Sequence, residues 1–315
     1  MIKKKIIIFG STGQIGRHLI RKLTKNNYKV TCQTRNSHKA VFLKTSGPIG
    51  FIDIAETNIF DKDKLNKLLS ESDICINLIG ILFEKGINSF QNIHVKFPDL
   101  LSKLCEKNNV NLIHVSALGI EQANDSEYAK SKMDGEKKIK TNCKNAVIIK
   151  PSIVYSVNDN FTTKFMSMLS LLPFFPLYYN GSTKFTPIHA SDLSDLIFFV
   201  IDKEIQGKNI EALGPEVINF KNIMKQICDS INKKRILIPL PLSLAKFSAY
   251  FFQKLPKPLI TLDQLKLLKY DNIKSNINIS NFDIGCPSKI KFVEGIKKYS
   301  YNWTEGGQFS RNKNR

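Results

Sequence analysis

Short apolar runs alternate with helical patterns along the first half of the chain. Runs of Ile, Val and Phe that end at glycine or polar residues predict strands, and apolar residues spaced three and four apart predict amphipathic helices. The predicted strands are Lys5–Phe9, Lys29–Thr34, Ile49–Ile54, Ile74–Ile79, Asn111–Val115 and Ala146–Lys150. The predicted helices are Gln14–Lys25, Asp61–Ser70, Asn92–Asn108 and Tyr128–Thr141, with Asp61 as an N-cap.

Strands that alternate with helices are typical of βαβ units. We therefore predict an α/β fold with a doubly wound parallel sheet of the Rossmann type. The pattern changes after Lys150, where prolines interrupt the chain before a further helix at Ser191–Lys203. This change predicts a Rossmann domain at 1–155, a smaller C-terminal α/β lobe at 156–305 that is interleaved with it, and a flexible tail at 306–315.

The chain of 315 residues carries a large surplus of positive charge. Its 47 Lys and Arg residues outnumber its 27 Asp and Glu residues, which gives a formal net charge of +20. Such a surplus fits an anionic membrane surface, an acidic protein partner or nucleic acid, but a lysine-rich base composition explains it equally well. The lysines are spread along the chain without a basic segment that contains interleaved aromatics, so nucleic acid is not the expected partner.

Neither the cysteines nor the histidines form a metal-binding pattern. The six cysteines are scattered without a C-x-x-C pair, which argues against zinc and disulfides and favours a reducing, cytoplasmic location. Cys75 and Cys105 are expected to be buried apolar residues. The apolar run near the N-terminus has four residues and is too short for a signal peptide, and no run long enough for a membrane span follows it.

A glycine-rich loop joins the first predicted strand to the first predicted helix. Its residues are Gly10, Ser11, Thr12, Gly13, Gln14, Ile15 and Gly16, with the spacing G-x-x-G-x-x-G. Glycines at these places permit a tight turn and let the backbone approach a pyrophosphate at a helix N-terminus. The strand–loop–helix context therefore predicts a dinucleotide site.

The end of the second predicted strand indicates which dinucleotide binds. An NAD site usually has a carboxylate there to bind the ribose 2′-hydroxyl, but the strand ends in Thr34 and Arg35. Arg35 can bind a 2′-phosphate instead, so we predict NADP(H) in preference to NAD(H). Asp53 is expected to end the third strand and to accept hydrogen bonds from adenine, and Gly80 to leave room for the adenosine ribose.

Several motifs together resemble the extended or atypical short-chain dehydrogenase/reductase superfamily. They are the glycine loop, Tyr128-Ala-Lys-Ser-Lys132, Lys150-Pro151-Ser152-Ile153-Val154-Tyr155 and Thr186-Pro187-Ile188-His189-Ala190-Ser191-Asp192. The stretches Ile76–Gly80, His114–Gly119 and Leu259–Asn272 are similar to those of the nucleotide-binding accessory subunit of respiratory complex I and its bacterial relatives. The resemblance covers roughly residues 5–275 and adds Leu78, Pro151 and Lys132 to the residues expected at the nucleotide.

The resemblance also implies a catalytic group. Tyr128 and Lys132 are four residues apart, which places both on one helical face, and in this superfamily such a pair performs acid–base chemistry. The third member is usually a Ser or Thr two residues beyond Ser116, where this chain has Leu118. Ser116 either takes that role or ends the strand. His189 is expected to be structural, and Asp192 to cap the helix that follows.

Two late segments are unusually apolar. Phe165–Tyr179 fits a lid over an apolar substrate, a surface that docks to a membrane or partner, or ordinary packing between lobes. Pro239–Pro258 has Leu, Phe and Tyr interspersed with Lys246 and Lys254, which fits either an amphipathic helix at a membrane surface or core packing.

Two functions remain open on this evidence. The first is an accessory or assembly component of respiratory NADH:quinone oxidoreductase that holds NADP(H), with complex I subunits or an anionic membrane as partners. It would lie in the cytoplasm or peripherally on the inner face of the respiratory membrane. The second is a free-standing NADP-dependent reductase, dehydrogenase or sugar-nucleotide-type epimerase that uses Tyr128 and Lys132 on a small-molecule substrate. The sequence does not decide whether the protein is an enzyme.

Overall fold

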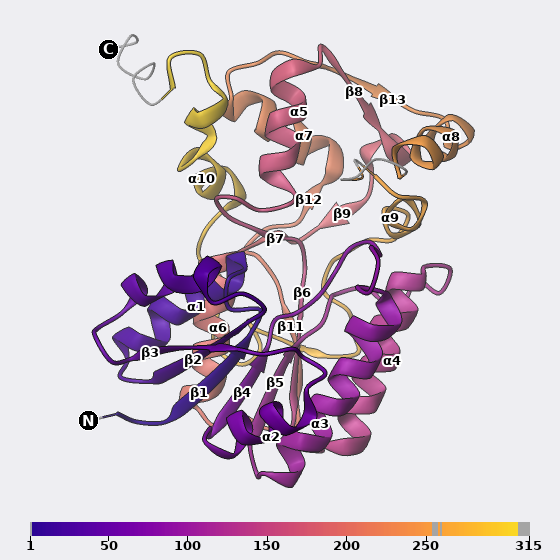
Figure 1. Cartoon of the computed structure of the whole chain (residues 1–315). Coiled ribbons are helices and arrows are strands. Elements are labelled where there is room, and N and C mark those ends of the chain that lie inside the picture. Colours follow the sequence, from indigo (N-terminus) through magenta and orange to yellow (C-terminus); the bar gives the residue numbers. More distant parts are fainter. Residues whose placement is uncertain (1, 254–257, 259, 308–315) are drawn as a thin grey trace.

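In the computed structural model, which describes residues 2–253, 258 and 260–307, eight parallel strands form the central sheet (Figure 1). Their order across the sheet is β14-β11-β6-β5-β4-β1-β2-β3. The bounds are β1 Lys5–Phe9, β2 Lys29–Thr34, β3 Ile52–Glu56, β4 Ile74–Asn77, β5 Asn111–Val115, β6 Val147–Pro151, β11 Asn209–Ala212 and β14 Ile279–Ser280. The order reverses between β1 and β4, and ligands of doubly wound sheets bind at this reversal, beyond the carboxyl ends of the strands.

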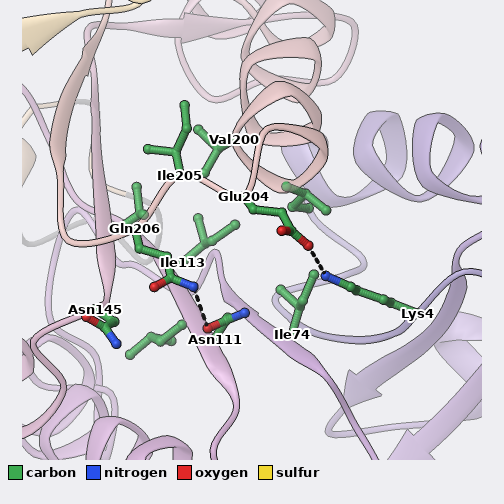
Figure 2. A pocket seen from close by; sticks show the side chains of 12 residues that line it. Lys4, Ile74, Asn111, Ile113, Asn145, Val200, Glu204, Ile205 and Gln206 are labelled. Carbon is green, nitrogen blue, oxygen red and sulfur yellow. Dashed lines mark hydrogen bonds and ion pairs between the residues drawn. The ribbon is translucent and has the colours of Figure 1, made fainter.

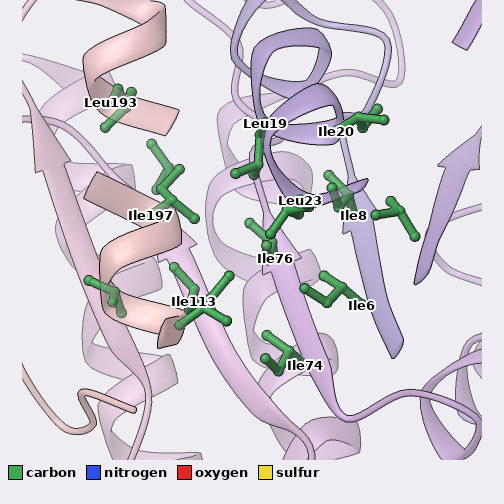
Figure 3. Packing of buried hydrophobic residues seen from close by; sticks show 14 of the residues in the cluster. Ile6, Ile8, Leu19, Ile20, Leu23, Ile74, Ile76, Ile113, Leu193 and Ile197 are labelled. Atoms are coloured by element: carbon green, nitrogen blue, oxygen red, sulfur yellow. The ribbon is translucent and has the colours of Figure 1, made fainter. Parts of the chain in front are cut away.

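Helices cover both faces of the sheet. They are α1 Gln14–Lys25, α2 Lys62–Ser70, α3 Phe97–Lys107, α4 Glu127–Asn142 and α6 Ala190–Asp202, with short helical segments at His38–Ser46 and Gln91–Lys96. Successive residues of β1 explain why its apolar run is unbroken. Ile6 and Ile8 pack against α1 and α6 (Figure 3), whereas Ile7 and Phe9 pack against the helices of the other face. A strand buried on both faces has no polar side to expose.

The C-terminal lobe sits beyond the carboxyl edge of the sheet (Figure 1). Its helices are α5 Thr162–Leu171, α7 Phe220–Ser230, α8 Leu242–Phe252, α9 Leu262–Leu267 and α10 Phe292–Lys297, with short segments at Tyr178–Gly181 and Ser300–Trp303. Its strands are β7 Val154–Tyr155, β8 Phe174–Leu177, β9 Lys184–Phe185, β10 Ile188–His189, β12 Ile218–Asn219 and β13 Ile236–Pro239. Tyr155, Phe175, Phe220 and Phe292 form its core. No helix in the described part of the chain is long and apolar enough to cross a bilayer.

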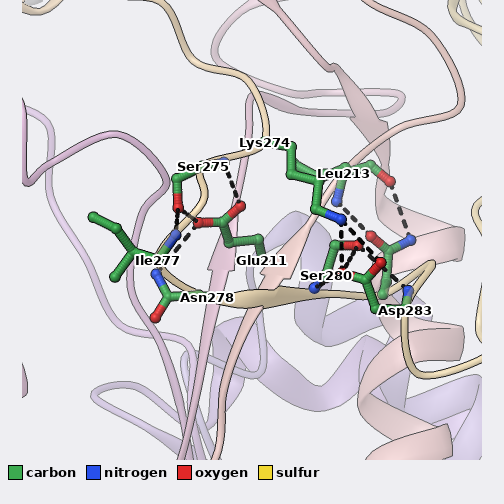
Figure 4. A network of polar contacts seen from close by, with 9 residues as sticks. Glu211, Leu213, Lys274, Ser275, Ile277, Asn278, Ser280 and Asp283 are labelled. Atoms are coloured by element: carbon green, nitrogen blue, oxygen red, sulfur yellow. Dashed lines mark hydrogen bonds and ion pairs between the residues drawn. The ribbon is translucent and has the colours of Figure 1, made fainter.

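Chain segments after residue 155 return to the sheet. The helix α6 packs on α1, and β11 and β14 extend the sheet past β6. Buried Glu211 on β11 holds this last part in place, because its carboxylate accepts hydrogen bonds from the Ser275 amide (2.9 Å) and from Asn278 (3.3 Å) (Figure 4). Asp283 binds Lys274 beside it. The predicted tail at 306–315 falls mostly on residues 308–315, outside the described residues.

Most predicted elements are confirmed, and three differ in an informative way. The third strand is Ile52–Glu56, because Ile49 and Gly50 form a turn in which Phe51 donates to the Pro48 carbonyl. The predicted helix Asn92–Asn108 begins as a π-helical turn, since Pro98 has no N–H to donate to the His94 carbonyl. Asp192 does not cap its helix: its carboxylate accepts from the Lys289 and Ile290 amides, and His189 is the N-cap.

A small cavity lies at the amino ends of the strands, on the far side of the sheet from the carboxyl edge where doubly wound folds bind ligands (Figure 2). Lys4, Ile74 and Asn111, at the amino ends of β1, β4 and β5, line it, and the Lys4–Glu204 ion pair (2.6 Å) borders it. Its volume of about 20 Å³ is enough for about one water molecule. It is therefore not a site for a dinucleotide.

Candidate functional site

The glycine loop packs tightly between β1, β4 and α1. Gly10 has φ +81°, a conformation that favours glycine, and a Cβ atom there would lie 3.1 Å from the carbonyl carbon of Leu78. A Cβ atom on Gly16 would lie 2.4 Å from the Ser11 carbonyl oxygen, so only glycine lets the helix approach its own loop this closely. The Gly13 amide donates to the Gly10 carbonyl (3.1 Å) and closes the turn.

The first turn of α1 is left open for an anion. Gly13 is the N-cap, and neither a capping side chain nor an acidic residue occupies this turn in the described structure. The Gln14 side chain points elsewhere, since it donates to the Val154 carbonyl (3.2 Å) and accepts from Ser156 (3.2 Å). The backbone amides at the start of a helix carry partial positive charge and bind phosphate groups.

Arg35 lies at the same edge of the sheet. Ser11 in the loop donates to the Gln33 carbonyl (2.9 Å), which ties the loop to the end of β2, and Arg35 follows β2 directly with its side chain exposed. The Glu56 carboxylate at the end of β3 accepts from the Ser37 amide (2.8 Å). Arg35 thus lies next to the position that a phosphate on the adenosine ribose would occupy in a Rossmann site.

The expectation for Asp53 is wrong. Asp53 is the second residue of β3, paired with Thr31, and its carboxylate forms an ion pair with Lys29 (2.9 Å). The shift of β3 by two residues places Asp53 away from the carboxyl edge, where Thr57 and Asn58 lie instead. The structure also differs from the prediction for Gly80. The strand β4 ends at Asn77, before Gly80, and a Cβ atom on Gly80 would lie 3.2 Å from the Lys132 ammonium nitrogen. Gly80 therefore makes room for Lys132.

Tyr128 and Lys132 lie on one face of α4, next to the ends of β4 and β5. Lys132 is buried, and its ammonium group lies 3.5 Å from the Val115 carbonyl. Ser116 comes next in the chain, and its buried hydroxyl has no hydrogen-bond partner among the described residues. Pro151 ends the neighbouring strand β6, and its carbonyl accepts from the Leu118 amide (2.9 Å). The fold therefore brings together the residues expected at the nicotinamide end.

Burial and charge set the protonation of this group. Burial lowers the pKa of Lys132 to about 8, against the opposing effect of the Glu136 carboxylate. Burial raises the pKa of Tyr128, and the negative charge of Asp263 raises it further. Without a ligand, Tyr128 therefore stays protonated and is not poised to remove a proton from a substrate.

His94 supports this helix and was missed by the sequence reasoning. Its Nε2 accepts from the Ile81 amide (3.1 Å), so the ring hydrogen is on Nδ1, which donates to Ser131 (2.9 Å). Ser131 in turn donates to the Tyr128 carbonyl (2.8 Å). Burial and then the charge of Lys132 lower the pKa of His94 to about 2, so this ring stays neutral and acts as a structural bridge.

A buried ion pair lies beneath Lys132. Lys150 on β6 contacts Glu136 (2.8 Å) and also Glu121. Burial favours the neutral form of Lys150, but the two carboxylates more than offset this and raise its pKa. One Glu136 oxygen is buried without a hydrogen-bond partner in the described structure. Glu136 lies one helical turn after Lys132, but its ion pair is with Lys150 on another element, so no local spacing signalled this contact.

Asp263 joins the C-terminal lobe to α4. Its carboxylate accepts hydrogen bonds from the Ser126 hydroxyl (2.8 Å), the Glu127 amide (2.9 Å) and the Tyr128 amide (3.0 Å). It thus satisfies amides at the start of the helix that carries Tyr128. Since Asp263 is 137 residues from Ser126 in the chain, no local pattern could have revealed this contact.

The structure offers no alternative centre of metal or disulfide chemistry within its described residues. All six cysteines are free thiols, and Cys75 and Cys105 are buried as predicted. No group of His, Cys, Asp and Glu side chains in residues 2–253, 258 and 260–307 is arranged to hold a metal ion. The glycine loop and the Tyr128 group are therefore the candidate functional site.

The fold and the loop define a Rossmann protein of the short-chain dehydrogenase/reductase type. The chain belongs to the family described as RmlD substrate binding domain, which it matches over residues 4–215. It is 26% identical over 299 residues to the mitochondrial NADH dehydrogenase (ubiquinone) 1 alpha subcomplex subunit 9 of Arabidopsis thaliana, covering 90% of this chain and 74% of that protein.

Solved structures of enzymes share the fold at low sequence identity. A triphenylmethane reductase from Citrobacter sp., complexed with NADP(H), has a TM-score of 0.73 at 15% identity and covers 93% of this chain and 99% of its own. A dTDP-glucose 4,6-dehydratase from Bacillus anthracis, in complex with NAD, has a TM-score of 0.70 at 14% identity and covers 96% of each chain. At this identity the likeness establishes the fold.

Replacement of Lys132 by Met tests the electrostatics of the site. The folded protein releases the Lys132 proton near pH 8 and the unfolded chain near 10.5, so unfolding takes up a proton between these values. The free energy of unfolding therefore rises with pH across this window. At pH 7, Lys132→Met should raise it by about 2 kcal/mol and remove this contribution to the pH dependence.

Urea denaturation between pH 7 and pH 10.5 measures both effects. Lys140→Met, at an exposed position of the same helix, is the control and should leave the pH dependence unchanged. A Lys132→Met protein that is less stable at pH 7 and keeps the full slope would contradict the proposed desolvation of Lys132.

Proposed function

We propose that this protein holds a nicotinamide dinucleotide in its glycine loop, NADP(H) in preference to NAD(H), as an accessory or assembly component of respiratory NADH:quinone oxidoreductase. The main observation in favour is the start of α1, whose amides lie behind a loop where Gly10 and Gly16 tolerate no side chain. That geometry fits a pyrophosphate. Neighbours of the same fold that bind NADP(H) or NAD support a nicotinamide nucleotide.

The residues suggest how the nucleotide would lie. The amides of the loop and of α1 would bind the pyrophosphate, and Arg35 the 2′-phosphate. The other half would run past Leu78 and Gly80 and past Pro151 at the end of β6, towards Lys132. There the Lys132 ammonium group would donate to the nicotinamide ribose, and the unpartnered hydroxyl of Ser116 is available beside it. When bound, the nicotinamide supplies a hydride donor or acceptor.

The state of Tyr128 favours a held nucleotide over a dehydrogenase reaction in which the tyrosine acts as a base. Its pKa is raised, chiefly by burial, and Asp263 adds to this shift. A tyrosine that removes a proton from a substrate would need the opposite shift, toward the operating pH. The alternative is a free-standing reductase, dehydrogenase or epimerase, and the position of Tyr128 one helical turn before Lys132, whose ammonium group lies next to Val115, supports it.

The relatives support a partner for this protein. A mitochondrial NADH dehydrogenase subunit matches 90% of this chain, which supports association with the corresponding respiratory complex. Such an association would place the protein at the inner face of the respiratory membrane. Residues 1–155 would bind the nucleotide, and the lobe from 156 to 305 would cover the site through contacts such as that of Asp263 with α4.

The identity of the retained nucleotide tests the cofactor. Mass spectrometry of small molecules released from the purified full chain should detect NADP(H) in excess over NAD(H). Arg35→Ala should weaken NADPH binding by about tenfold or more and leave NADH binding nearly unchanged, because it removes a charge-assisted contact to the 2′-phosphate alone. Calorimetric titration measures both affinities.

Lys39→Ala, at an exposed position after the same strand, is the matched control for Arg35→Ala. Equal affinities of the wild-type protein for NADH and NADPH, unaltered by Arg35→Ala, would contradict the assignment of Arg35.

Rapid mixing distinguishes the held nucleotide from turnover. We expect bound NADPH to be oxidised by quinone or carbonyl acceptors at the same slow rate in the wild-type protein and in Tyr128→Phe, because Tyr128 takes no part in proton transfer. The absorbance of the reduced nicotinamide reports the rate. A fall of about a hundredfold in Tyr128→Phe would instead support the enzyme alternative.

A further inference from the structure

The helix α8 places its large apolar side chains outward. Ala245 and Ala249 face the lobe and are 1% and 0% exposed, whereas Leu244 and Phe247 are 54% and 64% exposed. The inward residues pack on Tyr178 and Leu240. A helix on the surface of a globular protein normally has the reverse arrangement, with its largest apolar residues against the core. The outer face of α8 is therefore shaped for contact with an apolar environment.

The apolar surface continues into the strands that precede the helix. β8 and β13 form a parallel pair in which Ile236 lies opposite Phe174, and these two side chains are 68% and 55% exposed. β13 leads into α8 at the end of the lobe (Figure 1). We call this surface the α8 face, and it comprises Phe174, Ile236, Ile238, Leu242, Leu244 and Phe247. Several exposed apolar side chains on neighbouring elements are typical of an interaction site.

The apolar segment at Phe165–Tyr179 divides between two roles. Phe165 packs in the core of the lobe with Phe175, and Leu177 is buried as well. Phe174 belongs to the α8 face. The segment is therefore partly core and partly surface, and its exposed part joins the second apolar segment of the sequence.

The charged residues around the α8 face indicate which kind of surface it contacts. The two stretches that supply it, residues 161–191 and 231–262, contain no Asp or Glu, although the whole chain has 27. Their basic residues within the described part of the chain are Lys164, Lys184, Lys233, Lys234, Arg235 and Lys246, of which Lys233 pairs with Glu305; Lys254 and Lys257 lie outside the described residues. Lys246 is exposed on α8 itself, and Lys234 is exposed just before β13. Exposed apolar side chains with unscreened lysines beside them, such as Lys246 and Lys234, match a surface that is both apolar and anionic.

We propose that the α8 face docks this protein onto a bilayer that contains anionic phospholipid. The helix of 11 residues, about 16 Å long, would lie in the plane of the interface with Leu244 and Phe247 among the acyl chains. Lys246 and Lys234 would lie at the level of the phosphates. The face is remote in sequence from the glycine loop, so docking should not require the nucleotide.

Co-sedimentation of the purified full chain with vesicles tests the proposal. The vesicles are phosphatidylcholine alone or phosphatidylcholine mixed with phosphatidylglycerol. The wild-type protein should sediment with the anionic vesicles, and more weakly as salt is raised. The double variant Leu244→Glu/Phe247→Glu should bind at least about tenfold more weakly. Lys246→Glu should reduce binding and its dependence on salt.

The matched control is Ile49→Glu/Ile277→Glu, which adds the same charges at two exposed isoleucines elsewhere. It should bind vesicles as the wild-type protein does, and circular dichroism and nucleotide retention should be unchanged in both double variants. The proposal fails if the wild-type protein stays in the supernatant, or if the control loses binding equally. It also fails if the wild-type protein is a dimer that binds no vesicles and that Leu244→Glu/Phe247→Glu converts to a monomer, because the face would then join two copies.

Discussion

The close approach of Gly16 to the backbone of Ser11 is the constraint on which the site depends. It sets α1 directly behind its own loop, so that the first helical turn begins beside the point where the strand order reverses. Because Gln14 turns its side chain to the C-terminal lobe, nothing from the described chain competes for the amides of that turn. A phosphate group is the natural complement of this arrangement.

A second constraint acts at the other end of the candidate site. Lys132, Glu136 and Lys150 place charges inside the protein between α4 and the sheet, and such charges are costly unless they are paired. Lys150 has two carboxylate partners, whereas Lys132 has the Val115 carbonyl at 3.5 Å and a lowered pKa of about 8. The site thus keeps Lys132 ready for a ligand at some cost in stability, as functional sites often do.

The local features of the chain could be predicted from the sequence, and the long-range ones could not. The strand Lys5–Phe9, the loop and the helix Gln14–Lys25 follow from an apolar run, three glycines and helical spacing, and the structure has those bounds. The prediction for Asp53 failed because the end of the third strand was placed two residues too early, which moves this side chain from the start of the strand to its end. Asp263 could not be found, because its contact depends on how the C-terminal lobe folds back on α4.

The decisive measurement is a crystal structure of the full chain grown with NADP(H). We expect density for the pyrophosphate within hydrogen-bonding distance of the amides of Gln14 and Ile15, the 2′-phosphate beside Arg35, and the nicotinamide ribose against Lys132. A nucleotide bound elsewhere, or a candidate site that stays without nucleotide at saturating concentration, would contradict this expectation.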